Sequence, residues 1–174
     1  KGTADAIDFY KDVFGATEDM RMEIAGGGGG QAELTDGNSM IMLGDECPDM
    51  DFLSPQSVGG TPVGICLYVA DCDAMFQLAV DKGAQMKKPM QDQFFGDRSG
   101  AVVDPWGHLW TMATRKETLT EEQIRERSAE FMKQMVGRLF EVKKHPAVRD
   151  LQRSIWMLAL TLGIDIQTWR QSNV

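Results

Sequence analysis

The sequence predicts an α+β fold of two tandem β-α-β-β-β modules that form a curved mixed sheet. An Asp-Pro-x-Gly turn at 104–107 lies between two apolar runs, and Asp36-Gly37 lies between two similar runs 68 residues earlier. Pro presets the first dihedral of such a turn and Gly supplies the positive one, so both sites are typical of hairpins. Helix-like segments around Asp5 and Asp73 repeat at the same offset. Two copies of one module therefore follow each other.

Each module is predicted to contain a helix followed by three strands. Thr3 and Gly15 delimit the first helix, and Asp71 and Gly83 delimit the second. Five glycines at 26–30 are typical of a hairpin tip, because the Lys-Ser/Thr of a phosphate loop does not follow them. The predicted strands cover residues 17–24, 31–35 and 38–43 in the first module, and 86–91, 100–103 and 108–114 in the second.

One strand of the second module has no counterpart in the first. Residues 63–69 form a strong apolar strand in front of the second helix, and the repeat offset places its equivalent ahead of Lys1. We expect tail residues of the same chain or of a sister chain to fill this position. Residues 164–169 alternate like a strand and are the better candidate, whereas residues 139–142 continue a helical stripe. The alternative is a longer gene product whose upstream residues supply the strand.

The predicted organisation follows from these elements. We expect an incomplete first module at 1–45, a linker at 46–61, a complete second module at 62–117 and a C-terminal helical extension at 118–174. In the extension, a capping box at Thr120 opens one helix. Pro146 starts another helix, which ends at Gly163.

Composition limits the classes of partner. The net charge of −8 argues against nucleic acid or an anionic membrane, which require a basic surface. The charge is uneven: residues 1–136 carry 12 Lys/Arg against 23 Asp/Glu, whereas residues 137–174 carry 6 against 3. The basic tail is therefore expected to dock on an acidic body. Three cysteines without a C-x-x-C pair predict reduced thiols in a cytoplasmic protein.

Six ordered segments resemble those of a known family. They are Ala6 to Tyr10 with Val13 to Ala16, then Ala32-Glu33-Leu34, Ile41-Met42-Leu43, Gly59 to Val63, Phe95 to Arg98, and Asp104 to His108. With the paired modules, they resemble the vicinal-oxygen-chelate superfamily of glyoxalases, bleomycin-resistance proteins and extradiol dioxygenases, and especially its PhnB-like branch. The resemblance covers roughly residues 3–131.

The resemblance also implies where a divalent metal would bind. In metal-using members, His, Glu or Gln ligands lie on the first and last strands of each module. The matching positions here are Gly64, Thr111 and Ile41, and none of these residues supplies a suitable donor. We therefore expect no metal and no other cofactor. His108 is interpreted as a structural residue on the helix-facing side with Trp110 and Met112.

These observations predict a metal-free protein that binds an apolar or aromatic small molecule in the sheet cavity. No nucleophile motif is present, so no catalytic residue is assigned. Asp97 and Arg98 are expected in a loop, either as a structural ion pair or as a cavity rim. Two other functions remain open: a metal-dependent enzyme of the same superfamily that uses Gln31, Glu33 or a partner chain, and a structural or interaction module. A homodimer is expected. The candidate ligand-binding residues are Gln31, Glu33, Ile41, Cys66, Phe94, Phe95, Arg98, Leu109 and Thr111.

Overall fold

The computed structural model describes residues 2–22 and 30–144. The chain divides into two compact units, residues 1–119 and 120–174, and each is described by itself. The first unit contains α1 (Thr3–Phe14), β1 (Thr17–Met22), β2 (Gln31–Asp36), β3 (Ser39–Gly44), a 3-10 turn η1 (Pro48–Met50), α2 (Pro55–Val58), β4 (Gly64–Tyr68), α3 (Cys72–Asp81), β5 (Gln85–Asp92), β6 (Asp97–Val103) and β7 (Leu109–Arg115).

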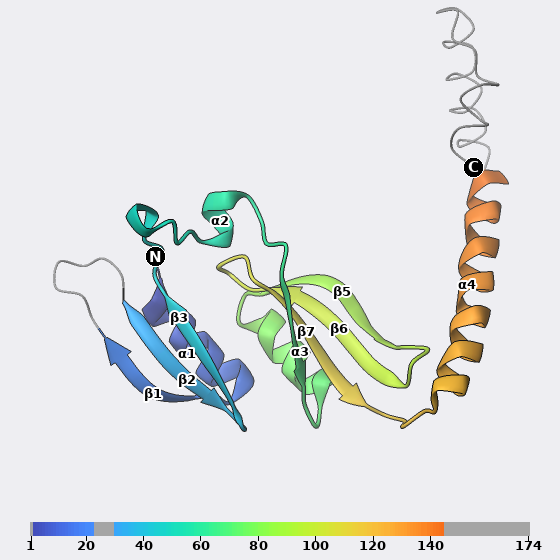
Figure 1. Cartoon of the computed structure of the whole chain (residues 1–174), viewed down its shortest axis with the longest axis horizontal. Coiled ribbons are helices and arrows are strands. Elements are labelled where there is room, and N and C mark those ends of the chain that lie inside the picture. The colour runs from blue at the N-terminus through green and yellow to red at the C-terminus, as the bar shows by residue number, and fades with distance from the viewer. Residues whose placement is uncertain (1, 23–29, 145–174) are drawn as a thin grey trace, which may run out of the picture. The chain divides into compact units, whose positions relative to one another are not determined.

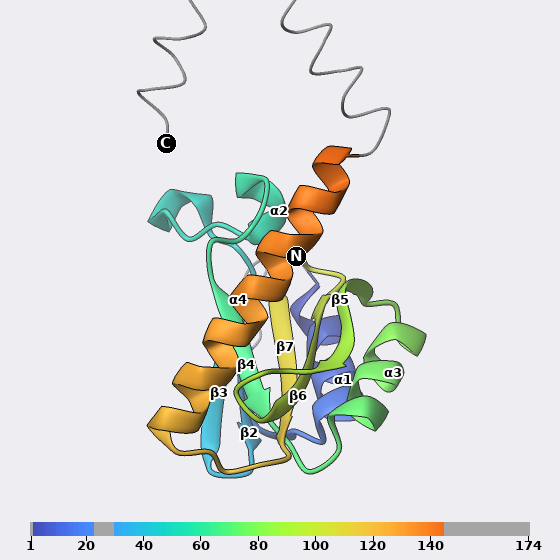
Figure 2. The same cartoon turned by 90° about the vertical axis from the view of Figure 1, so that its right-hand side faces the viewer.

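The predicted α+β class is confirmed by two sheets, each with a helix on one face (Figure 1). The first sheet is antiparallel in the order β1-β2-β3. The second has the order β4-β7-β6-β5, in which β4 pairs parallel with β7 and the other pairs are antiparallel. Figure 2 shows α1 and α3 on the same side of the two sheets.

The second unit contains α4 (Glu121–Lys144). Its capping box is present: the Thr120 amide donates to Oε1 of Gln123 at 2.9 Å, and the Gln123 amide donates to the Thr120 hydroxyl at 3.3 Å. The helix predicted from Pro146 and the strand predicted at 164–169 lie outside the described residues. None of the helices in the described ranges is both long and apolar enough to cross a membrane.

β3 lies at an edge of the first sheet. Among residues 2–22 and 30–144, no strand pairs with the side of β3 that faces away from β2. In the second sheet the equivalent strand, β7, is covered on that side by β4. The predicted filling of the β3 edge by another strand therefore stays a prediction.

Two local predictions are corrected. Thr3 is the first helical residue of α1 and not its N-cap, because its amide and hydroxyl both donate to Oδ1 of Asp45, at 3.1 and 2.6 Å. Asp97 and Arg98 do not lie in a loop but begin β6. The predicted cap of α3 is confirmed, since the Asp71 carboxylate accepts the Ala74 amide at 3.0 Å.

One hydrophobic core joins the two modules. α1 packs on β2 through the fully buried Ile7 and Leu34, and it also contacts the second module through its aromatic residues. The Phe14 and Trp110 ring centroids are 4.6 Å apart, and those of Tyr10 and Trp110 are 5.4 Å apart. An ion pair of 2.6 Å between Lys82 and Asp12 joins the end of α3 to α1. The first module is thus anchored on the second.

Candidate functional site

The face of the second sheet that points away from α3, here called the distal face, carries several predicted ligand residues. Paired residues on neighbouring strands share a face. The residues of the distal face therefore form four rows across the sheet, and each row consists of residues that pair on neighbouring strands. The rows are Gln85, Val103, Leu109 and Gly64; Lys88, Ala101, Thr111 and Cys66; Gln91, Ser99, Ala113 and Tyr68; and Asp97 with Arg115.

Small side chains lie on the two inner strands of this face, where Ala101 and Ala113 are only 3% and 2% exposed. Gly64, at the start of the edge strand β4, has no side chain. A β-carbon added at Gly64 would meet Leu109 Cδ2 at 3.5 Å, an ordinary van der Waals contact. The register thus places Leu109, Thr111 and Cys66 on one face.

A buried carboxylate fixes two exposed side chains at one end of the distal face. Asp97 is 2% exposed, and its Oδ2 accepts the Tyr68 hydroxyl at 2.6 Å while its Oδ1 accepts Nε of Arg115 at 3.0 Å. The Arg115 guanidinium also lies 5.4 Å from the centroid of the Tyr68 ring. The hydrogen bond to Asp97 raises the pKa of Tyr68, and the same carboxylate raises the pKa of Arg115. Both groups therefore act as hydrogen-bond donors at neutral pH, and the phenol is not a general base.

Cys66 occupies the middle of β4 on the same face. Burial, followed by the negative charge of Asp97, raises the pKa of the Cys66 thiol. A thiol becomes a nucleophile by losing its proton, which a cationic or helix N-terminal environment favours. Cys66 has the opposite environment and stays protonated at neutral pH. The distal face can therefore bind through its thiol, hydroxyl, ring and guanidinium groups, but it does not activate this cysteine.

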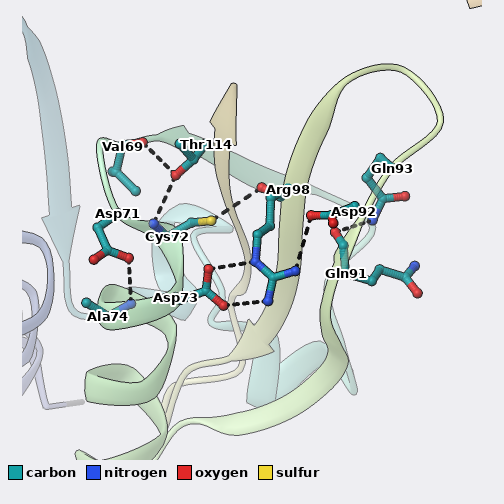
Figure 3. Close-up of polar contacts among 10 residues, drawn as sticks. All are labelled: Val69, Asp71, Cys72, Asp73, Ala74, Gln91, Asp92, Gln93, Arg98 and Thr114. Carbon is teal, nitrogen blue, oxygen red and sulfur yellow. Dashed lines mark hydrogen bonds and ion pairs between the residues drawn. The ribbon is translucent and has the colours of Figure 1, made fainter. Parts of the chain in front are cut away.

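Arg98 is not brought together with the residues of the distal face. It follows Asp97 in β6, so its side chain leaves the opposite face of the strand, toward α3. Figure 3 shows its guanidinium between Asp73 at the start of α3 and Asp92 at the end of β5. Nε and Nη2 donate to the two Asp73 oxygens at 2.6 and 2.7 Å, and Nη1 donates to Asp92 at 3.2 Å. This is a fork that ties α3 to the sheet.

Phe94 and Phe95 lie in the turn between β5 and β6. Their rings form an edge-to-face pair with centroids 5.2 Å apart, and Phe95 is 39% exposed. The turn is closed by the Gln93 amide, which donates to the Asp97 carbonyl at 2.7 Å. The structure therefore places the two rings directly before Asp97 in the chain, at the end of the distal face that carries Arg115.

Gln31 and Glu33 lie on the first sheet, on the face that points away from α1. The register places Glu33 in one row with Met20 and Met42, and Gln31 opposite Met22. All three methionines are 41–63% exposed. Gln31 and Glu33 therefore belong to a second surface, which is apolar apart from a few polar groups.

The expected equivalence of Ile41 and Thr111 is wrong. Ile41 pairs with the fully buried Leu34, so it faces α1, whereas Thr111 faces away from α3. The reason is the length of the two hairpin connections. Asp36 pairs with Ser39 around two residues, but Val103 pairs with Leu109 around five. The residues four positions after Gly37 and Gly107, which are Ile41 and Thr111, therefore lie on opposite faces of their sheets.

Ile41 instead lines a hollow between the modules. A pocket of about 160 Å³ is bordered by apolar side chains, among them Ile41, Ile65 and Trp110. A more polar pocket of about 260 Å³ shares Leu43 and His108 with it. Both volumes are below the roughly 300–1,000 Å³ of typical ligand pockets. The prediction that Trp110 and Met112 face the helices is confirmed, since both belong to the core beneath α1 and α3.

The residues at the metal positions do not fit a divalent cation. Gly64 and Thr111 lie on adjacent strands of the distal face, but a glycine has no side chain and a neutral threonine hydroxyl is a poor ligand. On the first sheet, the side chains that share the face of Glu33 on β3 are Met40 and Met42, whose thioethers favour soft cations. Within the described ranges, no three His, Cys, Asp or Glu residues are grouped so that they could hold a metal.

The sequence interpretation overlooked Tyr68 and Arg115. Both follow from alternation: Tyr68 is two residues after Cys66, and Arg115 is four residues after Thr111. The sequence does not show that the Asp97 carboxylate binds both side chains, because it predicts a loop at Asp97. Only the start of β6 at Asp97 places that carboxylate opposite Arg115.

Comparisons with known proteins agree with this architecture. The family model described as the Glyoxalase/Bleomycin resistance protein/Dioxygenase superfamily matches residues 1–112. An uncharacterised protein of Mycobacterium bovis is 40% identical over 124 residues, which are 70% of this chain and 82% of that protein.

Solved structures show the same fold. The structure of an Arabidopsis thaliana gene product is 27% identical with a TM-score of 0.51, and the match covers 64% of this chain and 88% of that one. A glyoxalase/bleomycin resistance protein/dioxygenase family enzyme of Burkholderia phytofirmans has a TM-score of 0.51 at 17% identity, covering 64% and 89%. The chain therefore belongs to the glyoxalase/bleomycin resistance protein/dioxygenase superfamily.

Proposed function

We propose that this protein binds a small organic molecule with an aromatic or apolar body on the distal face, without a metal ion. The observation that carries the proposal is the Asp97 arrangement. A buried carboxylate holds two exposed side chains, Tyr68 and Arg115, in fixed positions. Preorganised groups of this kind lower the entropy cost of binding.

The chemistry of the face favours binding over catalysis. The pKa values of Cys66 and Tyr68 are both raised, so neither group is poised as a nucleophile or a base. The residues at the family's metal positions supply no strong ligand for zinc, iron, nickel or manganese. Thr111, Cys66 and the Tyr68 ring offer a hydroxyl, a thiol and an aromatic surface to a ligand.

A thermal-shift screen in the presence of EDTA tests this proposal. A compound that binds only the native state stabilises it by RT ln(1 + L/Kd), where L is its concentration, so the melting temperature rises with the logarithm of L once L exceeds Kd. We expect aromatic compounds to raise it equally with and without EDTA, and Tyr68→Ala to remove the shift. Asn38→Ala, in the turn of the first hairpin, is the control.

The rival function is a metal-dependent enzyme, and its best support is Glu33 beside Gln31 on the first sheet. Elemental analysis of the purified protein distinguishes metal-free binding from a metal-dependent enzyme. A stoichiometric divalent ion that Glu33→Gln removes, together with ligand binding that EDTA abolishes, would overturn the metal-free proposal. A complete lack of stabilising compounds would favour a structural or interaction role.

A further inference from the structure

We infer that the ligand of the distal face is an organic carboxylate, whose oxygens bind Arg115 and whose apolar body extends toward Cys66 and Thr111. This inference rests on the proposed function and adds the charge and orientation of the ligand. It follows from three features of the face: the edge of a fixed guanidinium that no described residue binds, the neighbouring exposed Tyr68 side chain, and the sign of the local charge.

Within residues 2–22 and 30–144, the contacts of the Arg115 guanidinium lie on one side of it. Asp97 accepts Nε, and Nη2 lies at the limit of hydrogen bonding, 3.5 Å from the Tyr68 oxygen. Among the described residues no hydrogen bond engages Nη1. The Arg115 side chain is 57% exposed, whereas that of Asp97 is 1% exposed. The buried partner thus fixes the plane of the guanidinium and leaves its outer edge available.

An arginine held in this way suits a carboxylate. The guanidinium presents parallel N–H groups that match the two oxygens of a carboxylate, and such paired bonds are shorter and stronger than neutral ones. Arg98 makes such a paired contact with a carboxylate, because its Nε and Nη2 donate to the two oxygens of Asp73. On Arg115 the Nε position is taken by Asp97, so the remaining edge is formed by Nη1 and Nη2.

The Tyr68 side chain beside Arg115 accepts an apolar body. It pairs in its row with the buried Ala113 and exposes 58% of its surface. The following row contains Thr111 and Cys66, with a hydroxyl and an uncharged thiol. A ligand whose carboxylate sits on Arg115 therefore packs its ring against the exposed Tyr68 side chain and extends toward the row of Thr111 and Cys66.

The charge of the distal face also favours an anion. Its four rows contain two cations, Arg115 and Lys88, and one acid, Asp97, which Arg115 neutralises. The whole chain carries a net charge of −8. A locally cationic surface on an acidic protein concentrates anions at that surface, and added salt weakens the effect. In the first sheet, by contrast, the row of Met20 and Met42 contains the acidic Glu33.

The inference is tested with a matched pair of probes on the full chain, 2-naphthoate and 2-naphthamide. They have the same ring system and differ in charge. Calorimetry is expected to give a Kd at least about tenfold lower for the carboxylate, because its charge-assisted hydrogen bonds are stronger than those of the neutral amide. Raising the salt concentration is expected to weaken only the naphthoate complex.

Variants locate the carboxylate. Arg115→Gln is expected to raise the naphthoate Kd about tenfold or more and to leave the naphthamide Kd within about twofold. Arg115→Lys keeps the charge but loses the fork, so it is expected to recover part of the affinity. Arg98→Gln, an arginine on the other face of the same sheet, is the control and is expected to change neither Kd.

Alkylation provides a readout that does not depend on Arg115. Iodoacetamide modification of Cys66, measured by peptide mass mapping, is expected to slow when naphthoate is bound. Equal affinity for the two probes, with Cys66 protected by both, would overturn the carboxylate and leave the proposed function standing. Binding of neither probe would overturn the carboxylate, and a screen without any stabilising aromatic compound would overturn the proposed function as well. Tighter naphthoate binding that Arg115→Gln does not weaken, or that leaves Cys66 unprotected, would overturn this site.

Discussion

The Tyr10 hydroxyl donates a 2.7 Å hydrogen bond to Oδ2 of Asp104, which joins α1 of the first module to the hairpin loop of the second. The same oxygen accepts Nε1 of Trp110 at 2.8 Å, while Oδ1 accepts the amides of Trp106 and His108, both at 2.9 Å. Burial, together with the charge of Asp104, raises the pKa of Tyr10 far above its usual range, so the phenol remains a donor.

Asp104→Ala is expected to lower the free energy of unfolding by about 3 kcal/mol or more, because it leaves several buried donors without an acceptor. Tyr10→Phe removes one donor and is expected to cost about 1–2 kcal/mol. Urea unfolding of both variants measures the difference. Equal losses for the two would show that Asp104 does not act as the shared acceptor.

Ile41→Gln and Met42→Gln test the assignment of faces on β3. Ile41 faces α1, so placing an amide there is expected to cost about 1–3 kcal/mol. Met42 is 63% exposed, and its replacement is expected to change stability by less than about 0.5 kcal/mol. The chemical-denaturation midpoints of these two neighbours should therefore differ clearly. A larger loss for Met42→Gln would reverse the assignment.

The Arg98–Asp73 pair predicts a specific pH dependence. The hydrogen bond from Arg98 lowers the pKa of Asp73, so the native state binds fewer protons than the unfolded state. The stabilisation is complete above the unfolded-state pKa and is lost as the pH falls through the lowered native pKa. Between pH 7 and pH 3, the melting temperature of Arg98→Gln is expected to fall less than that of the parent. Parallel melting curves would contradict this.

Cys66 is expected to react slowly with iodoacetamide. Its raised pKa keeps the thiolate population at pH 8 below that of free cysteine, and the rate is expected to keep rising beyond the pH at which free cysteine levels off. Removing the nearby negative charge by Asp97→Asn is expected to increase the rate at pH 8. Cys72, which is 1% exposed, provides an unreactive internal reference in the same peptide map. Saturation of the Cys66 rate below pH 8 would contradict the prediction.

A homodimer is the remaining prediction from the sequence. Light scattering at micromolar concentration measures the mass directly, and a dimer is expected to weigh twice the 19.3 kDa of one chain. Deletion of residues 138–174 is expected to lower the melting temperature or change this mass if the tail contributes to the fold or the assembly. A monomer that the deletion leaves unchanged would contradict both expectations.

Much of the fold is readable from local signals in the sequence. The repeat predicts two hairpins of one design, and turn residues such as Gly107, whose φ is 94°, locate them. The helix limits at Gly15 and Asp71 follow from capping chemistry. The sequence resemblance adds the family, which the comparisons support.

The candidate site is harder to predict from the sequence than the fold, because the direction of each side chain depends on the register of its strand. Asp97 and Arg98 are consecutive in the chain, yet the first orients Tyr68 and Arg115 while the second binds α3. Ile41 was assigned to the wrong face because the two hairpins differ in loop length. Thr3 fits the pattern of an N-cap, but its hydroxyl donates to Asp45, which is 42 residues away in the chain. A local pattern does not show this contact.

The parallel pairing of β4 with β7 has a consequence for synthesis on the ribosome. The first sheet is a meander whose strands pair with their neighbours in the chain, so it can form as soon as Gly44 has emerged. β4 must instead wait for β7, because Gly64 pairs with Leu109 and Tyr68 with Ala113. Until β7 leaves the exit tunnel, the apolar Ile65 and Leu67 lack the strand with which they pair in the native sheet, so the second sheet closes after the first can form.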